Sequence, residues 1–471
     1  MSRIEEARQL HRLRAVRWGY VWAMWCAVLW GAWYLPGAAI WTVPPFSGAG
    51  ADGAAGFLAG AVVITSLSSI GVLLFLLLWL AVLEKLGEFW RTMRQFRRIA
   101  KWYFLAAIFG GPCALLGSFL AIGFVGPVFA AVATLLYPIV GATMARLWYH
   151  EKITLRAGAG IGVIVIGGIA IFVPGLTGEA AQAGDLVWIG YLGGFLAAFG
   201  WGVEGAVAGR ALDISDPDVG ITIRFAAEAA YWLVLLLPAA ALWLPAPVFG
   251  LAAAAFAPAA GLWLLLSGLS FAFCYVTWYK SFPLIGVGRG QAIGALHAVF
   301  AVIFLAIFAF DLPDWNFVLG LALTIGGTWL MVTEPAEVVE IVRDTSGLAA
   351  PAGALHLAPP PAGGLHMKGF ILALLAAAGE RGLWDYEIMQ ALVRRYRRDS
   401  AYWRGELRIT LTDLHSGALI DELEDALDDG RHFGPDRILM RFRISPFGHQ
   451  RLRDAGLVAA GPPPVGAGGA P

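Results

Sequence analysis

The sequence predicts an all-α polytopic membrane protein of ten transmembrane helices, arranged as two inverted five-helix repeats and followed by a small soluble α+β domain. Composition is the first observation: 59% of the 471 residues are hydrophobic and 14% are charged, with a mean hydropathy of +0.71. The second is that long apolar stretches recur from Trp18 to Glu334, each able to cross a bilayer as a helix. The third is a weak internal repeat between the two halves of this region.

Ten of these apolar stretches can be drawn as membrane spans, since each reaches the roughly 20 helical residues that a hydrocarbon core requires. The first stretch follows the basic residues 1–17 and is too long for the apolar core of a cleaved signal peptide, so we expect it to be retained. The transporter-like region 18–334 then divides into repeats at 18–174 and 186–334. Its spans are 18–40, 57–83, 102–122, 124–147, 155–174, 186–209, 220–244, 258–282, 288–310 and 315–334.

The charges between the spans predict an orientation. The segments assigned to one side carry eighteen Lys and Arg residues, including Arg210, Arg224, Lys280 and Arg289, and those on the other side carry none. Positively charged loops stay in the cytoplasm. We therefore expect both termini on the cytoplasmic face of the plasma (inner) membrane, with residues such as Lys280 anchoring span ends at the interface.

The two halves resemble each other in the order and spacing of a few residues. Five spans per half is an odd number, so the second copy is inverted in the bilayer, as in many secondary transporters with a binding site near the midplane. The alignment pairs Trp30-Gly31 with Trp201-Gly202, Tyr137-Pro138 with His297-Ala298, and Trp33 with Glu204.

Three titratable residues lie inside the predicted spans. A charge at the bilayer centre costs about 2.5–3.5 kcal/mol on insertion scales, so such residues normally face a bundle interior or cavity. We expect Glu204 to bind a proton or a substrate ammonium, with His297 adding a hydrogen bond. For Glu228 an ordinary i,i+4 ion pair with Arg224 is the alternative, and for His297 the alternative is a packing role.

Aromatic residues should surround the same cavity. Trp30, Trp33, Tyr137 and Trp201 lie on the spans that the repeat brings together, and aromatic faces attract organic cations. A cationic or amphipathic amine is the substrate class that these residues favour. The alternative is that these rings pack the core or anchor the protein at the interface.

No enzymatic or cofactor chemistry is indicated. The cysteines Cys26, Cys113 and Cys274 are isolated in apolar runs, without the spacing of a metal site or a disulfide framework. No nucleophile and base, metal cluster or phosphate-binding loop stands out in the sequence. We expect neither a catalytic site nor a cofactor.

Three stretches carry a family resemblance: "LWGAWY" in the first span, "YPIVGATMARLWYHEKIT" after the fourth span begins, and "YVTWYKSFPLIGVGRGQAIGALHAVFAVIF" through the eighth and ninth. Together they resemble the drug/metabolite transporter (DMT) superfamily, EamA-like type. The most specific part is Tyr137-Pro138 followed by the short charged turn that contains Glu151. The resemblance implies ten helices, a central cavity, alternating access and a small-metabolite substrate. The second repeat departs from it, with His297-Ala298 where the family usually keeps Tyr-Pro.

The chain after the last span has a different composition. Residues 335–366 are rich in Pro, Ala and Gly and predict a flexible linker, and residues 458–471 predict a disordered tail. Between them, 367–457 predict helices at 367–378, 383–396 and 410–427, then a strand and a short helix within 437–457. This order resembles the winged-helix domains of PadR-like or MarR-like regulators.

The predicted third helix of this domain argues against DNA binding, because it carries an acidic face that phosphates would repel. A regulatory or protein–protein role, such as a homodimer through this domain, is expected instead. The acidic residues are Asp413, Asp421, Glu422, Glu424 and Asp425.

Taken together, these features predict a proton-coupled secondary active transporter of a small organic metabolite. Two alternatives stay open: a membrane-embedded ligand sensor that signals through the winged-helix-like domain, and a flippase for a lipid-linked substrate.

Overall fold

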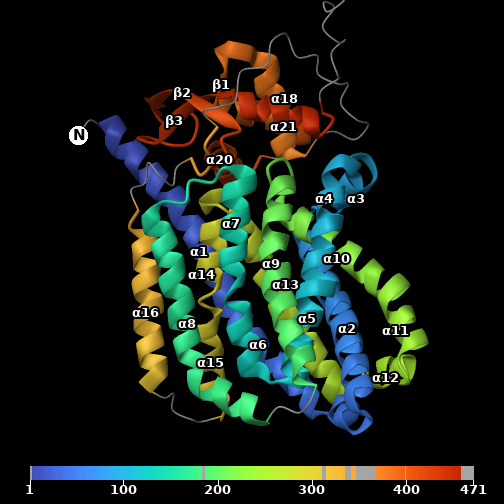
Figure 1. Ribbon diagram of the computed structural model, residues 1–471. Helices are drawn as coiled ribbons and strands as arrows, with labels where there is room; N and C mark the ends of the chain where they lie inside the picture. The colour runs from blue at the N-terminus through green and yellow to red at the C-terminus, as the bar shows by residue number, and fades with distance from the viewer. Residues whose placement is uncertain are drawn as a thin grey trace, which may run out of the picture.

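The computed structural model describes residues 3–182, 186–309, 315–334, 341–345, 366–397 and 399–457. It is a bundle of long helices with a small mixed domain at one end (Figure 1). Eight helices are long and apolar enough to cross a membrane: Val16–Thr42, Gly53–Val82, Arg97–Phe124, Phe129–Tyr149, Val187–Leu212, Pro217–Trp243, Pro258–Ile285 and Val287–Phe304.

These eight helices coincide with predicted spans to within a few residues. The predicted fifth and tenth spans correspond to shorter apolar helices, Leu155–Ala170 and Val318–Val332. A polytopic membrane protein follows from the eight, and the count of ten spans stays a prediction.

Most of the bundle is built from continuous helices and short connecting elements. Helix α1 packs along α13 and α15, α8 along α16, and α5 along α9. The bounds are α1 Arg3–Ala39, η1 Ile40–Thr42, η2 Phe46–Asp52, α2 Gly53–Val82, α3 Leu86–Gln95, α8 Leu155–Gln182, α9 Val187–Leu212, α12 Val248–Ala254, α13 Pro258–Ile285 and α16 Trp315–Val332.

Two spans are broken in the same way. Each has a helix of 8 residues, an interruption, and then a helix of 13 residues that starts at Tyr137 in one span and at His297 in the other. Each short helix follows a glycine with positive φ, Gly126 or Gly286, a conformation that side chains rarely adopt. The four helices are α6 Pro127–Thr134, α7 Tyr137–Tyr149, α14 Val287–Gly294 and α15 His297–Ala309. The sequence alignment of Tyr137 with His297 therefore pairs the first residues of α7 and α15.

Two other spans contain a π-helical turn. Pro112 lies inside the first, and Pro238 is the second residue of the helix that follows the second. Proline cannot donate a backbone hydrogen bond, so a widened turn accommodates it. These spans run through α4 Arg97–Ile108, η3 Phe109–Leu115 and α5 Leu116–Phe124, and through α10 Pro217–Tyr231, η4 Trp232–Leu236 and α11 Leu237–Trp243.

The C-terminal domain, residues 366–457, combines four helices with a three-stranded antiparallel sheet of order β1-β3-β2. Leucine side chains of α20, among them Leu407 and Leu414, are buried in its core. Its elements are α18 Met367–Ala378, η5 Gly379–Arg381, β1 Leu383–Trp384, α19 Asp385–Tyr396, α20 Ala401–Ser416, β2 Ile420–Leu427, β3 Ile438–Ile444 and α21 Pro446–Asp454.

The predicted helix 410–427 is wrong. Helix α20 ends at Ser416, and 420–427 form strand β2, which pairs with β3 from Ile420–Ile444 to Leu427–Ile438. The acidic residues from Asp421 to Asp425 thus lie on a strand. They do not form a helical face with Asp413.

The acidic strand faces basic residues of the same chain. Arg8, near the start of α1, pairs with Glu422 and lies 3.0 Å from Asp425. Arg441 on β3 pairs with Glu424 at 3.1 Å. The first residues of α1 and the C-terminal domain therefore meet at the same end of the bundle (Figure 1).

Part of the predicted linker 335–366 is described. The backbone of Val342 bonds Lys152 (2.8 Å) and Ser416 (3.0 Å), so residues 341–345 lie between the bundle and α20. The predicted tail 458–471 and most of the linker fall outside the described residues.

Candidate functional site

A triad of buried charges lies in the second half of the membrane-spanning region. Arg224 on α10 places its Nε 2.7 Å from Oε1 of Glu204 on α9, and it pairs through NH1 with Glu228 on its own helix. All three side chains are completely buried. The predicted i,i+4 pair is present, but Arg224 serves both carboxylates.

Neutral donors complete the hydrogen bonding of both carboxylates. Tyr279 and Tyr275 donate to Glu204 at 3.1 and 3.2 Å. Ser69 on α2 and the indole of Trp232, at 3.3 Å, donate to Glu228. Buried charges need partners of this kind to offset desolvation.

The π-turn of the third span makes room for the triad. A Cβ at Gly110 would overlap the Arg224 guanidinium and the Glu204 carboxylate, and one at Gly111 would lie 2.5 Å from Cδ of Glu228. The two glycines let the backbone of η3 approach the charges directly. The first half of the bundle contributes this notch together with Ser69.

The predicted aromatic residues gather around Trp30, next to the interruptions of the two broken spans. The Trp30 ring is 5.2 Å from that of Tyr137, 4.8 Å from that of Trp201, and stacked on the imidazole of His297 at 4.6 Å. The Tyr137 hydroxyl donates to the carbonyl of Gln291 at 2.6 Å. The two broken spans are thus linked where their helices are interrupted.

His297 links the two broken spans by a second contact. Its Nε2 lies 3.4 Å from Thr134 Oγ1 at the end of α6, and its Nδ1 lies 3.2 Å from the Gly294 carbonyl. Trp33 packs elsewhere: its ring stacks on Phe271 at 4.7 Å and its indole donates to Ser267 at 2.8 Å.

The aromatic cluster and the charge triad are connected by one hydrogen-bonded path. The Trp201 indole donates to the Tyr275 hydroxyl at 2.7 Å, and that hydroxyl in turn donates to Glu204. Six of the seven predicted site residues therefore form a continuous buried unit, and Trp33 borders it through Phe271, which also contacts Trp30. The six are Trp30, Tyr137, Trp201, Glu204, Glu228 and His297.

Sequence reasoning missed several members of this unit. Tyr275 and Tyr279 are four residues apart on α13 and could have been found as a polar stripe on an apolar helix. Gln291 bonds the carbonyls of Trp201 and Gly202, and the glycine pair 110–111 is visible in the sequence as "FGGPC".

Three cations assigned to the cytoplasmic segments are placed differently. Arg224 belongs to the buried triad, and Arg289 is buried against Glu334 with an Nε to Oε2 distance of 2.8 Å. Lys280 pairs with Asp218 at 3.0 Å.

The broken span that contains α14 is fixed at one end by Glu151. The Glu151 carboxylate accepts the backbone N–H groups of Val287 and Gly288 at 3.0 and 3.3 Å, which satisfies the free donors of a helix start. Burial raises the pKa of Glu151. The turn that carries the family resemblance is thus a helix cap.

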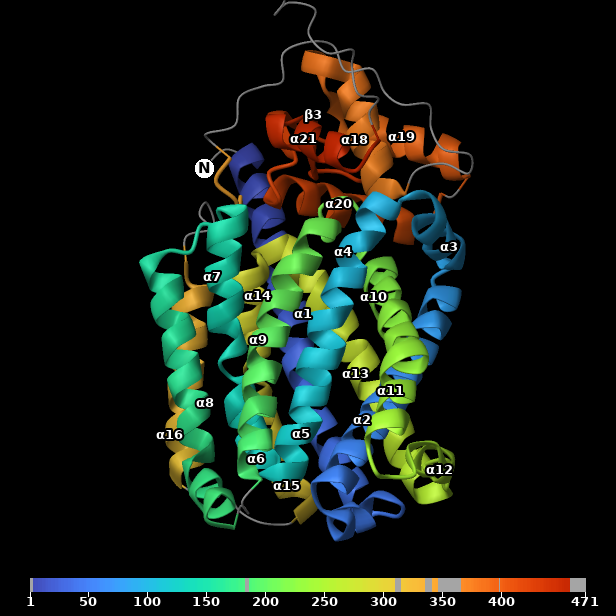
Figure 2. The same cartoon turned by 45° about the vertical axis from the view of Figure 1, so that its right-hand side comes forward.

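Asp213, just after α9, joins the C-terminal domain to the bundle. It lies 2.7 Å from Arg343 and 3.0 Å from Arg451 of α21. The domain is seated on the end of the bundle where α9 and α7 terminate (Figure 2). These ion pairs hold the domain against that end of the bundle.

Comparison with known proteins adds little to this picture. No family model matches the chain, and no curated protein matches it. One solved structure that does match is described as "Crystal structure of protein"; it is 18% identical, with a TM-score of 0.47, over 66% of this chain and 95% of that chain. A likeness of this size assigns neither a family nor an activity.

Proposed function

We propose that this protein is a proton-coupled secondary active transporter of a small organic metabolite, of the EamA-like type within the drug/metabolite transporter superfamily. It would work by alternating access in the plasma membrane, with both termini in the cytoplasm. The observation that carries the proposal is the buried triad of Glu204, Arg224 and Glu228.

The triad has a charge that favours an exchangeable cation. Two carboxylates share one guanidinium, so the group is electroneutral when one carboxylate is protonated or when a substrate cation lies beside it. An uncompensated buried charge is costly. A proton and an amine would therefore compete for the carboxylate that Arg224 does not neutralise. Such competition is what a transporter needs in order to exchange the two. Glu204 is the better candidate, since the Tyr275 path leads from it to the aromatic cluster.

The broken spans supply the means of movement. Their interruptions lie beside Trp30, where Tyr137 and His297 contact the opposite broken span. Discontinuous helices at the midplane are typical of transporter binding sites. A tilt of the helices at these interruptions would open the aromatic cluster to one side at a time, and the rings would accept an amine by cation–π contact.

The test is flux in proteoliposomes. A thermal-shift screen of amines and amino acids selects a stabilising compound, whose radiolabelled form is followed into proteoliposomes with and without an imposed pH gradient. We expect gradient-driven uptake by the native chain and its loss in Glu204→Gln. Glu380→Gln is the matched control, because its side chain is 91% exposed and lies outside the bundle. Uptake at the same rate with and without the pH gradient would contradict proton coupling.

A ligand sensor is the second candidate, and one observation favours it: α20 packs against the bundle helix α13, and its Glu406 lies 3.6 Å from Lys85 of the bundle. Movement in the bundle would reach the C-terminal domain directly. Specific binding to the bundle without flux in either direction would favour the sensor over the transporter.

We further propose that the C-terminal domain is winged-helix-like and acts through protein contacts. The second helix of a helix-turn-helix pair normally enters the DNA major groove, and α20 holds that place after α19. Its residues Trp403, Glu406 and Thr410 face the bundle side, while Leu407 and Leu414 face its own core. Full-length protein in nanodiscs should therefore leave the mobility of a random DNA duplex unchanged. A shifted band would contradict this role.

A further inference from the structure

We propose that the cavity between the bundle and the C-terminal domain is a second ligand site, for a small amphipathic amine that also carries a hydrogen-bond acceptor. The site lies apart from the charge triad, and the inference does not rest on the proposed transport function. Its occupant would contact both parts of the chain and hold the C-terminal domain in place.

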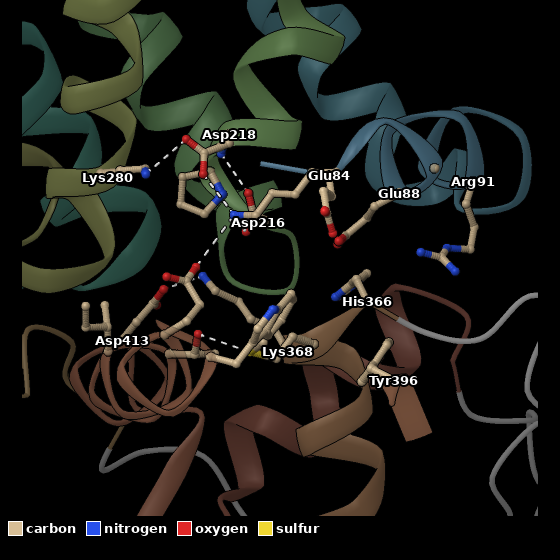
Figure 3. A pocket seen from close by; sticks show the side chains of 18 of the residues that line it. Glu84, Glu88, Arg91, Asp216, Asp218, Lys280, His366, Lys368, Tyr396 and Asp413 are labelled. Carbon is tan, nitrogen blue, oxygen red and sulfur yellow. Dashed lines mark hydrogen bonds and ion pairs between the residues drawn. The ribbon is translucent and has the colours of Figure 1, made fainter. Parts of the chain in front are cut away.

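The cavity has a volume of about 350 Å³. One wall comes from the bundle, with residues that precede or belong to α3, α10 and α13, and the other from α18, α19 and α20 (Figure 3). Polar and aromatic side chains line it: Trp22, Glu84, Lys85, Glu88, Arg91, Asp216, Asp218, Lys280, His366, Lys368, Tyr396, Trp403, Glu406 and Asp413.

The lining is acidic, with six carboxylates against four basic side chains. The lysines are engaged by acids already. Lys85 lies 2.7, 2.9 and 3.6 Å from Asp216, Asp218 and Glu406. Lys368 lies 2.5 Å from Asp413 and also donates to the carbonyl of Leu212. An anion would meet net repulsion here, and a cation net attraction.

Glu88 is the carboxylate that the lining leaves incompletely neutralised. Among the described residues it has no ion pair within 4.0 Å. Burial and the nearby Asp216 carboxylate raise the pKa of Glu88 to about 7, against the attraction of Lys85 and Arg91. An ammonium group placed beside Glu88 would supply the missing partner.

His366 supplies an independent sign of a ligand. Its side chain is 2% exposed, and its Nδ1 accepts the N–H of Gly369 at 3.0 Å, which caps α18. The proton of the neutral ring is therefore on Nε2, and Nε2 has no hydrogen-bond partner among the described residues. Burial and the charges of Lys368 and Arg91 lower the pKa of His366 to about 3, so the ring stays neutral.

A buried donor without a partner loses its hydrogen bonds to water and gains none in return, so it destabilises the ligand-free protein. In Figure 3 the His366 side chain lies between Glu88 and Tyr396 within the cavity. The Glu88 carboxylate is close enough to Tyr396 to raise the pKa of its hydroxyl. A hydroxyl or carbonyl oxygen on the ligand would accept a hydrogen bond from the Nε2–H group of His366, while the ligand's ammonium contacts Glu88.

The remaining lining sets the body of the ligand. The rings of Tyr396 and Trp403 and the aliphatic side chains of Leu284 and Ile409 form apolar surface beside the acids. The ligand needs an ammonium for Glu88, a hydrogen-bond acceptor for His366 and an apolar body for this surface. A compact aromatic amine with a hydroxyl group has all three. A metal ion is not favoured, because the described residues contain no group of three or more His, Cys, Asp or Glu that could hold one.

The test uses tyramine as the probe and isothermal titration of the full chain in detergent. Tyrosol, which has a hydroxyl in place of the ammonium, and phenethylamine, which lacks the phenol, are the matched ligands. We expect saturable binding of tyramine, with tyrosol and phenethylamine each at least about tenfold weaker, as for loss of a charge-assisted or buried hydrogen bond. Absence of saturable tyramine binding, or equal binding of tyrosol, would overturn the proposal.

Variants assign the site. Glu88→Gln should weaken tyramine by about tenfold and leave tyrosol unchanged, while Glu380→Gln should change neither. His366→Asn keeps an acceptor for the Gly369 N–H but removes the Nε2 donor, so it should weaken tyramine more than phenethylamine. Unfolding temperatures without ligand show whether each variant is folded. Binding that survives in Glu88→Gln but is lost in Glu204→Gln would place the amine at the triad and overturn this assignment.

Discussion

Arg224 and Glu204 form an ion pair of 2.7 Å between α10 and α9 with both side chains completely buried. Every charge of the triad comes from the second half of the bundle, and the alignment of the two halves of the sequence places Trp33 opposite Glu204. Trp33 stacks on Phe271 instead of meeting a charge. The two aligned positions therefore have different surroundings, and Gly110 and Gly111 of η3 form the notch that encloses the triad.

Removing the shared cation should destabilise the fold strongly. Arg224→Met leaves Glu204 and Glu228 buried without a counter-charge, and breaking a buried pair in this way costs about 3–5 kcal/mol. The double variant Arg224→Met with Glu204→Gln removes one of the two orphaned charges and should recover part of the loss. Denaturant titration in detergent measures both. Equal stability of the single and double variants would contradict the shared role of Arg224.

Adding a side chain at a notch glycine should destabilise the protein, whereas adding one at a glycine in open space should not. Gly110→Ala should destabilise the protein by about 1–3 kcal/mol, because its Cβ would force the Arg224 and Glu204 side chains apart. Gly162→Ala on α8 is the matched control, since its Cβ would meet nothing within 4 Å. That change should be neutral or slightly stabilising. Thermal unfolding of the two variants side by side decides the matter.

The apolar spans were predictable because length and hydropathy determine them. The repeat alignment paired Tyr137 with His297, but it did not predict the interruption that precedes each of them. Strand β2 was not predicted either, because Ile420, Leu423 and Leu427 recur at helical spacing. Pairing with β3, across a register shift between Glu422 and Glu424, decided the outcome; tertiary contacts commonly override such local patterns.

The partner of Glu204 could not be read from the sequence for a related reason. Helical spacing identifies neighbours on one helix, and it correctly paired Arg224 with Glu228. The contact to Glu204 runs between helices and depends on how α9 and α10 pack. The interdomain cavity is of the same kind, since it joins residues about 300 positions apart, such as Glu88 and Tyr396.

The attachment of the C-terminal domain to the bundle depends on Asp213. Asp213→Asn weakens the contacts to both Arg343 and Arg451, each buried, so the domain should loosen while the bundle stays intact. Hydrogen exchange of the full chain should rise in α20 and α21 and stay unchanged in α2. Asp399→Asn removes an exposed pair with Arg404 and should leave exchange in α21 as it was. Equal exchange rates of α20 and α21 in Asp213→Asn and in the native chain would show that Asp213 does not hold the domain in place.

Tyramine binding in the interdomain cavity should strengthen with rising pH. The pKa of Glu88 is raised to about 7, so its carboxyl is neutral below that value and ionised above it, while the amine stays protonated throughout. If the ionised form binds the ammonium, affinity should rise by about tenfold between about pH 6 and about pH 8. Isothermal titration at a series of pH values measures the slope.

Other groups that face Glu88 must be separated from it. His366 stays neutral over this range, with a pKa of about 3, and the hydroxyl of Tyr396 stays protonated because burial raises its pKa. Although burial opposes it, the carboxylates of Asp216, Asp218 and Glu406 raise the pKa of Lys85 well above its usual value, so this ammonium remains cationic. Arg91 is a further basic side chain of the lining. The carboxyls are the competitors: burial raises the pKa of Glu406 and that of Asp413 to about 6, and Asp216, Asp218 and Glu84 complete the acidic lining. Glu88→Gln should flatten the pH profile and Glu406→Gln should preserve it. A slope that persists in Glu88→Gln would assign the titration to another of these carboxyls and remove Glu88 from the ammonium contact.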